Sequence, residues 1–174
     1  RLSESVADGI LESVSEGLNQ NGIEIWINTI KSFSNSQTSR IIIKNIIEET
    51  PAILRSIPQS QYLEWVKQCY RISEVSEDLS ITYVNATTGV IENLKPRHLL
   101  DWGNIGLSLY RSSKNSTSLV NNFFKYSPSL CLKLNYEELE ILNDTLKRIS
   151  TRSISFSIKI LDWVLKISSI APSD

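Results

Sequence analysis

Residues 62–65 read Tyr-Leu-Glu-Trp and residues 99–102 read Leu-Leu-Asp-Trp, so two large apolar residues, an acidic residue and a tryptophan recur 37 positions apart. Trp26 lies 39 positions before the first of these tryptophans, and Leu142 lies 40 positions after the second. Self-similarity at such a period is typical of repeat proteins, in which each unit buries its apolar face on its neighbours. The spacing therefore predicts about four units of 37–40 residues.

Each unit is predicted to contain a first helix that carries the tryptophan, a second helix and a short third turn. Apolar residues of the first helices, such as Trp102, Ile105 and Leu109, follow the spacing of about 3–4 residues that marks one helical face. The β-branched run 41–43 and the alternating run 153–158 also fit strands. Both runs occupy the second-helix position of a unit, so we expect helices there, because tertiary context overrides local propensity.

A hydroxyl residue followed by proline or threonine recurs late in three units, as Thr50-Pro51, Thr87-Thr88 and Ser127-Pro128. The tryptophan or leucine of the next unit lies 14 positions after the second residue of each pair. A hydroxyl can accept a hydrogen bond from an unpaired amide at a helix start, and proline is favoured at the first helical position. We therefore expect Pro51 and Pro128 to begin the third turn of their units.

These features predict one all-α domain over residues 1–174, built as a solenoid-like α-helical repeat array of helical hairpins. An N-terminal helix over residues 3–18, with its apolar row Val6, Ile10, Val14 and Leu18, is expected to cap one end, because terminal units must hide one face from water. The chain begins at Arg1 and contains no methionine, so we expect it to be part of a longer protein.

Composition argues against several classes of partner. The net charge of −1 gives no electrostatic support for nucleic-acid binding, since phosphates require a basic surface. The apolar runs fall short of the roughly 20 residues of a membrane span, so no membrane span is expected. Cys69 and Cys131 have neither zinc-site spacing nor the pattern of a disulfide framework, and we expect them to be buried thiols of a cytoplasmic protein.

Few residues suggest catalysis. His98 is the single histidine of the chain, which excludes a His-pair metal site, and we expect it at a solvated helix start. The acidic residues 137, 138, 140 and 144 follow Asn135, and Asn135 with Glu138 forms a capping-box pattern, so these carboxylates are expected to stabilise the start of a helix. The sequence predicts no catalytic residue, no metal site and no cofactor, and it favours a protein that is not an enzyme.

The recurring aromatic residues allow two interpretations. Equivalent apolar positions of successive units normally build a continuous core. The residues predicted to form this repeat core are Trp26, Trp65, Trp102, Leu142, Pro51 and Pro128. The alternative is an aromatic pocket between units that would bind a small molecule or support catalysis, lined by Tyr62, Trp65, Trp102 and Tyr110. Trp163 is out of phase with the other tryptophans, which favours a place at the end of the array or against a continuation of the chain.

Residues 122–130 read Asn-Phe-Phe-Lys-Tyr-Ser-Pro-Ser-Leu and precede the helix that carries Leu142. This stretch resembles a bacterial helical-repeat region of proteins that contain a von Willebrand A domain and work as partners of MoxR-class AAA+ ATPases. The second unit departs from the pattern by lacking Ser-Pro, and the fourth by lacking the tryptophan. The resemblance implies an adaptor that engages the AAA+ ATPase or its client. We therefore expect a non-catalytic protein–protein interaction scaffold.

Overall fold

The computed structural model describes residues 14–33 and 36–170, and every regular element in that part of the chain is a helix. The all-α prediction is therefore confirmed, and runs 41–43 and 154–158 are helical. In chain order the helices are α2 (Gln20–Ser32), α3 (Gln37–Ser56), α4 (Gln59–Val75), α5 (Glu77–Ile91), the 3-10 turn η1 (Pro96–His98), α6 (Leu99–Ser112), α7 (Thr117–Cys131), α8 (Tyr136–Ser150) and α9 (Ile154–Ile170).

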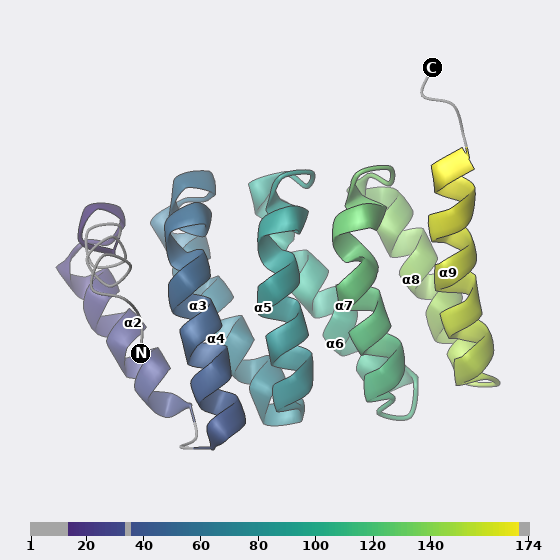
Figure 1. Cartoon of the computed structure of the whole chain (residues 1–174), viewed down its shortest axis with the longest axis horizontal. Coiled ribbons are helices and arrows are strands. Elements are labelled where there is room, and N and C mark those ends of the chain that lie inside the picture. Colours follow the sequence, from purple (N-terminus) through teal and green to yellow (C-terminus); the bar gives the residue numbers. More distant parts are fainter. Residues whose placement is uncertain (1–13, 34–35, 171–174) are drawn as a thin grey trace.

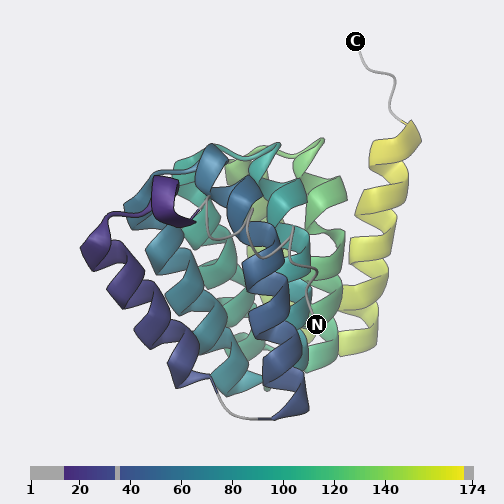
Figure 2. The same cartoon turned by 60° about the vertical axis from the view of Figure 1, so that its left-hand side comes forward.

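The helices form two layers (Figure 1, Figure 2). One layer contains α3, α5, α7 and α9 side by side, and the other contains α2, α4, α6 and α8. The helices α4–α5, α6–α7 and α8–α9 pair across the layers, and α3 packs on α4. We call the consecutive helices α2 and α3, α4 and α5, α6 and α7, and α8 and α9 units 1 to 4. Of the predicted N-terminal helix, Val14 and Leu18 are buried, whereas residues 3–13 lie outside the described residues.

A serine begins the second helix of each unit. Ser36, Ser76 and Ser116 are the N-caps of α3, α5 and α7, and each hydroxyl accepts a hydrogen bond from the backbone amide three residues later. Ser153 accepts the corresponding bond from the amide of Phe156 at the start of α9, at 3.2 Å. Because such a cap stabilises a helix by about 1 kcal/mol, this repeated serine defines where the second helices start.

The prediction that Pro51 and Pro128 begin a third turn is wrong, because both prolines lie inside helices, in α3 and α7. The hydroxyls of Thr50 and Ser127 do not cap a new helix. They donate to the carbonyls four residues earlier, each at 2.7 Å. A proline costs a helix one hydrogen bond, but the buried face continues past it, for example to Ile53, and packing keeps α3 helical.

A buried hydrogen bond explains why these hydroxyl residues recur. Trp65 Nε1 donates to Thr87 Oγ1 at 3.1 Å in unit 2, and Trp102 Nε1 donates to Ser127 Oγ at 2.8 Å in unit 3. A buried indole N–H usually needs such a partner. In unit 1 the Thr50 hydroxyl instead shares a hydrogen bond of 2.7 Å with the Tyr62 phenol.

Unit 4 replaces both partners of this bond by apolar residues. Thr87 and Ser127 each lie ten positions after the first residue of their helix, and Val164 holds that position in α9. Leu142 stands where units 2 and 3 have tryptophan, and it is buried. Replacing both members of a buried polar pair by apolar residues costs little, whereas replacing one leaves the other unpaired.

Replacing Thr87 with valine should therefore lower the free energy of unfolding by about 1–2 kcal/mol, because Trp65 Nε1 would remain buried without its acceptor. Urea unfolding followed by circular dichroism measures the change. Thr145→Val is the matched control, since the Thr145 hydroxyl is exposed and bonds only the carbonyl of Ile141. Equal losses in both variants would contradict a role for the indole hydrogen bond.

Candidate functional site

The residues with catalytic potential are dispersed or buried. Among the described residues, no group of three or more His, Cys, Asp or Glu side chains is placed to hold a metal ion. Cys69 and Cys131 are buried free thiols, and burial raises the pKa of both, that of Cys131 to about 12. Both cysteines are therefore protonated at neutral pH, and neither is an activated nucleophile.

His98 lies at the start of α6, as expected, but its ring is largely covered rather than solvated. The imidazole stacks on the ring of Tyr136, with centroids 4.1 Å apart. Its Nε2 accepts a hydrogen bond of 3.0 Å from Arg97 Nε, and its Nδ1 lies 3.6 Å from a carboxylate oxygen of Asp101. These contacts join η1 to α6 and α8, and they assign the histidine a packing role.

The residues of the alternative aromatic pocket lie mostly in the core. Tyr62, Trp65 and Trp102 are fully buried, and Tyr110 is partly buried. Tyr83 stacks on Trp102 with centroids 4.7 Å apart, and Phe124 packs edge-on against the same indole at 5.3 Å. A ligand would reach the buried rings of Tyr62, Trp65 and Trp102 only after the helices separate. Trp26 is partly buried, as are Pro51 and Pro128.

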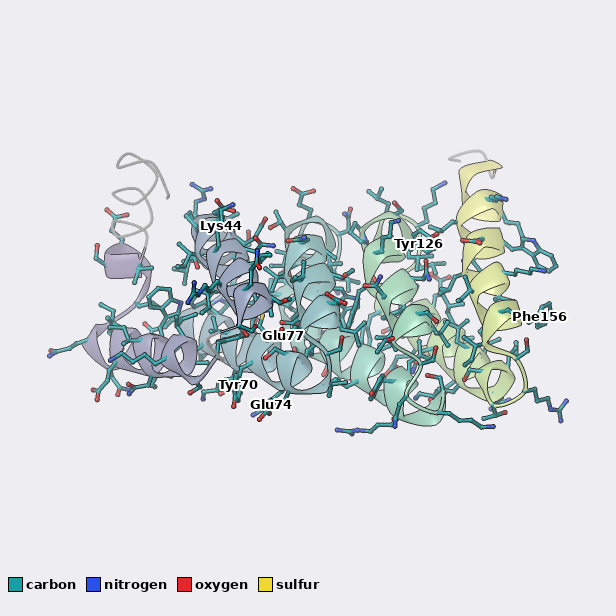
Figure 3. The ribbon with its side chains drawn as sticks, turned by 60° about the horizontal axis from the view of Figure 1, so that its bottom comes forward. Lys44, Tyr70, Glu74, Glu77, Tyr126 and Phe156 are labelled. Carbon is teal, nitrogen blue, oxygen red and sulfur yellow. The ribbon has the colours of Figure 1, made fainter. Side chains whose placement is uncertain are left out.

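Three exposed large apolar residues, two of them aromatic, form one row on α9. Phe156, Trp163 and Ile167 have exposed fractions of 45%, 55% and 67%, and the half-buried Ile160 lies between the first two. Their spacing of four, three and four residues places them on one side of the helix. Figure 3 shows Phe156 at the outer edge of the array, pointing away from the other helices. We call this row the α9 face.

The α9 face repeats a surface that is buried elsewhere in the molecule. Counted from the first residue of each helix, its four residues correspond to four buried residues of α5. These α5 residues are Leu79, Tyr83, Ala86 and Val90. The next second helix, α7, packs against α5, but no described helix packs on the outer side of α9 (Figure 2). The exposed position of Trp163 agrees with the expectation from the sequence of a place at the end of the array or against a continuation of the chain.

The charges around the α9 face are mainly positive. Lys159 and Lys166 are exposed on α9, and a hollow at the α8–α9 turn is lined by Arg148 and Arg152 together with Phe156. Asp162 is directed to the phenol of Tyr126 on α7, whose pKa is raised by burial and then by this hydrogen bond. The acidic residue of α9 is thus directed to α7, whereas Lys159 and Lys166 are exposed.

A second uncovered surface is a groove of about 330 Å³ between α6 and α8, which we call the α6–α8 groove. Its walls come from consecutive units and are mostly polar. The lining residues are Asp101, Asn104, Ile105 and Ser108 of α6 with Tyr136, Glu140, Asn143, Asp144 and Lys147 of α8. No pattern in the sequence predicted this groove.

The acidic stretch after Asn135 divides into two roles. Glu138 completes the predicted capping box: its carboxylate accepts from the amide of Asn135 at 2.8 Å, and its own amide donates to the Asn135 side chain at 3.0 Å. Glu140 and Asp144 instead line the α6–α8 groove. The prediction that all these carboxylates serve the helix start therefore holds for the first turn and fails beyond it.

Negative charge gathers around Tyr136 at one side of the groove. Its phenol donates to Glu140 at 2.9 Å. Burial raises the pKa of Tyr136 most, followed by the hydrogen bond to Glu140 and the negative charges of Asp101, Glu140 and Glu137. These causes show that carboxylates of both helices act on the same region.

Known proteins give no independent guide to either surface. Both surfaces are identified from the structure alone, and the relation to MoxR-associated proteins stays a prediction. No protein-family model, no curated protein and no solved structure matches this chain.

Proposed function

We propose that this protein is a non-catalytic interaction module that binds an amphipathic helix of another protein along the α9 face. The observation that carries the proposal is the uncovered row of Phe156, Ile160, Trp163 and Ile167, at positions that are buried in α5. Contiguous exposed apolar residues mark interaction sites, and tryptophan is enriched among the residues that dominate binding energy.

A helix is the occupant that this surface fits best. In each preceding step of the array, a second helix is covered by the next one: α3 by α5, α5 by α7 and α7 by α9. A partner helix with an apolar stripe would continue this packing, as in other complexes in which a helix lies on an apolar surface. Because Lys159, Lys166 and the nearby arginines border the row, acidic residues beside the apolar stripe of the partner would complement it.

Charge also favours another protein over a second copy of this chain as the occupant of the α9 face. In a two-fold contact between two copies of α9, the helices run antiparallel and the centre falls close to Trp163. Lys159 of one copy then lies opposite the Lys166 region of the other, and like charges at an interface weaken association. The resemblance of residues 122–130 to the MoxR-associated repeat region suggests an AAA+ ATPase or its client as the partner.

Replacing Trp163 with aspartate is expected to abolish partner retention while leaving the array folded. The new charge would lie in the middle of the apolar row and oppose its contact with an apolar stripe. Because Trp163 is exposed, the substitution should change the free energy of unfolding by no more than about 0.5 kcal/mol. Affinity capture with the full chain as bait, quantified by mass spectrometry, measures retention. Thermal unfolding followed by circular dichroism checks the fold.

Ile141→Asp is the matched control, because Ile141 of α8 is similarly exposed, at 66%, and lies outside the α9 face. Proteins lost with Trp163→Asp and kept with Ile141→Asp support the proposal. The proposal is contradicted if both variants retain the same proteins as the wild type, or if both lose them. Sedimentation of the purified chain supplies a second criterion: a dimer that Trp163→Asp dissociates would replace the partner helix by a second copy.

A further inference from the structure

We infer that the α6–α8 groove is a separate binding site for an arginine side chain on a basic segment of a partner protein. The inference goes beyond the proposed role of the α9 face and does not depend on it. It rests on a buried amide oxygen without a hydrogen-bond partner among the described residues, an excess of carboxylates and the shape of a groove whose polar residues come from two walls.

The first observation is Asn143, a lining residue of the groove that is only 4% exposed. Its side-chain oxygen is buried and has no hydrogen-bond partner among the described residues. Buried polar groups are nearly always paired, and each exception needs a reason. A donor brought by a ligand would supply the missing partner.

The preceding interface of the same layer shows what a completed contact is like. Between α4 and α6 the buried Gln68 amide donates to the carbonyl of Leu100 at 3.1 Å and to Asn104 Oδ1 at 3.0 Å. Its oxygen accepts from the Tyr83 phenol at 2.7 Å. Gln68 is thus satisfied from within the protein, whereas Asn143, one interface further along, is not.

The second observation is the charge of the groove. Asp101 contributes a carboxylate from α6, and Glu140 and Asp144 contribute two from α8. Of the described residues that line the groove, Lys147 is the one cation, and it pairs with Asp144 at 3.3 Å. Because Lys147 offsets only Asp144, the carboxylates of Asp101 and Glu140 give the groove a net negative charge. Both charges also act on the phenol of Tyr136.

The ligand chemistry follows from where these acceptors lie. The described carboxylates do not cluster as metal ligands do, since they come from opposite walls. A guanidinium carries its charge on a planar group with five N–H donors, so one ligand can contact both walls and the Asn143 oxygen. The ammonium of lysine is a compact point charge and would satisfy fewer acceptors. A volume of about 330 Å³ suits one long side chain rather than a folded segment.

The test uses the full chain and three short peptides that differ at one residue: arginine, lysine or the neutral analogue citrulline, flanked by glycine and serine and blocked at both ends. Titration followed by two-dimensional NMR gives the Kd and the shift of the Asn143 side-chain amide. We expect the arginine peptide to bind, the lysine peptide to bind about tenfold more weakly, and the citrulline peptide more weakly still.

Glu140→Gln and Asn143→Ala should each raise the Kd of the arginine peptide by about tenfold, since each removes an acceptor of the groove. Glu48→Gln is the matched control: it makes the same change of net charge on α3, far from the groove, and should leave the Kd within about twofold. Trp163→Asp should also leave it unchanged. Circular dichroism confirms that each variant folds.

Three outcomes would overturn the inference. One is no binding of the arginine peptide at millimolar concentration. Another is equal affinity for the arginine and citrulline peptides, or for the arginine and lysine peptides. The last is a loss of affinity in Glu48→Gln as large as in Glu140→Gln, which would mean that the general field of the protein attracts the peptide.

Discussion

Replacing Trp102 with alanine is expected to lower the free energy of unfolding by about 3–5 kcal/mol. Trp102 is fully buried, stacks on Tyr83 and contacts the edge of Phe124, so its removal leaves a cavity between units 2 and 3. It also removes the hydrogen bond to Ser127. Urea unfolding, monitored by circular dichroism at equilibrium, measures the loss.

Two controls separate the causes of that loss. Trp163→Ala removes an equally large but exposed side chain and should change stability by no more than about 0.5 kcal/mol. Trp102→Phe keeps most of the ring but not the N–H, and the Ser127 hydroxyl retains its bond to the carbonyl of Phe123. We expect an intermediate loss. A change below about 1 kcal/mol for Trp102→Ala would contradict a core position.

The period of the tryptophans was sufficient to predict the helical units, because a repeated core residue marks a repeated packing environment. The fixed distance from Thr50, Thr87 and Ser127 to the next unit is also real, but a helix start is not its cause. A hydroxyl before proline resembles a helix start, and the sequence does not show that an indole or phenol from the neighbouring helix will reach it. The second helices of the units start instead at the serines 36, 76, 116 and 153.

The two candidate surfaces were predictable to different degrees. The phase of Trp163, which differs from that of the other tryptophans, predicts a place at the end of the array or against a continuation of the chain. The α6–α8 groove was not visible, because Asp101 and Glu140 are 39 positions apart and look unrelated until two first helices lie side by side. That separation is itself one repeat. Comparing polar residues of successive units in register is the signal that could have found the groove.

Substituting Gly106 with valine should destabilise the protein by about 3 kcal/mol, although valine is no worse than glycine in a helix. A Cβ atom at Gly106 would overlap the ring of Phe124. That ring is fully buried and held by edge-on contacts with Tyr83 at 5.2 Å and Trp102 at 5.3 Å, so it cannot move aside without disturbing both. Urea unfolding measures the loss against the wild type.

A double-mutant cycle with Phe124→Ala tests that cause. Phe124→Ala alone should cost about 3–5 kcal/mol, because it empties the space beside Gly106. In that background the valine at position 106 fills part of the cavity, and we expect it to be neutral or stabilising. The two substitutions should therefore couple by about 3 kcal/mol or more in the favourable direction. Additive losses would mean that the glycine is needed for a reason other than the close approach of α6 and α7.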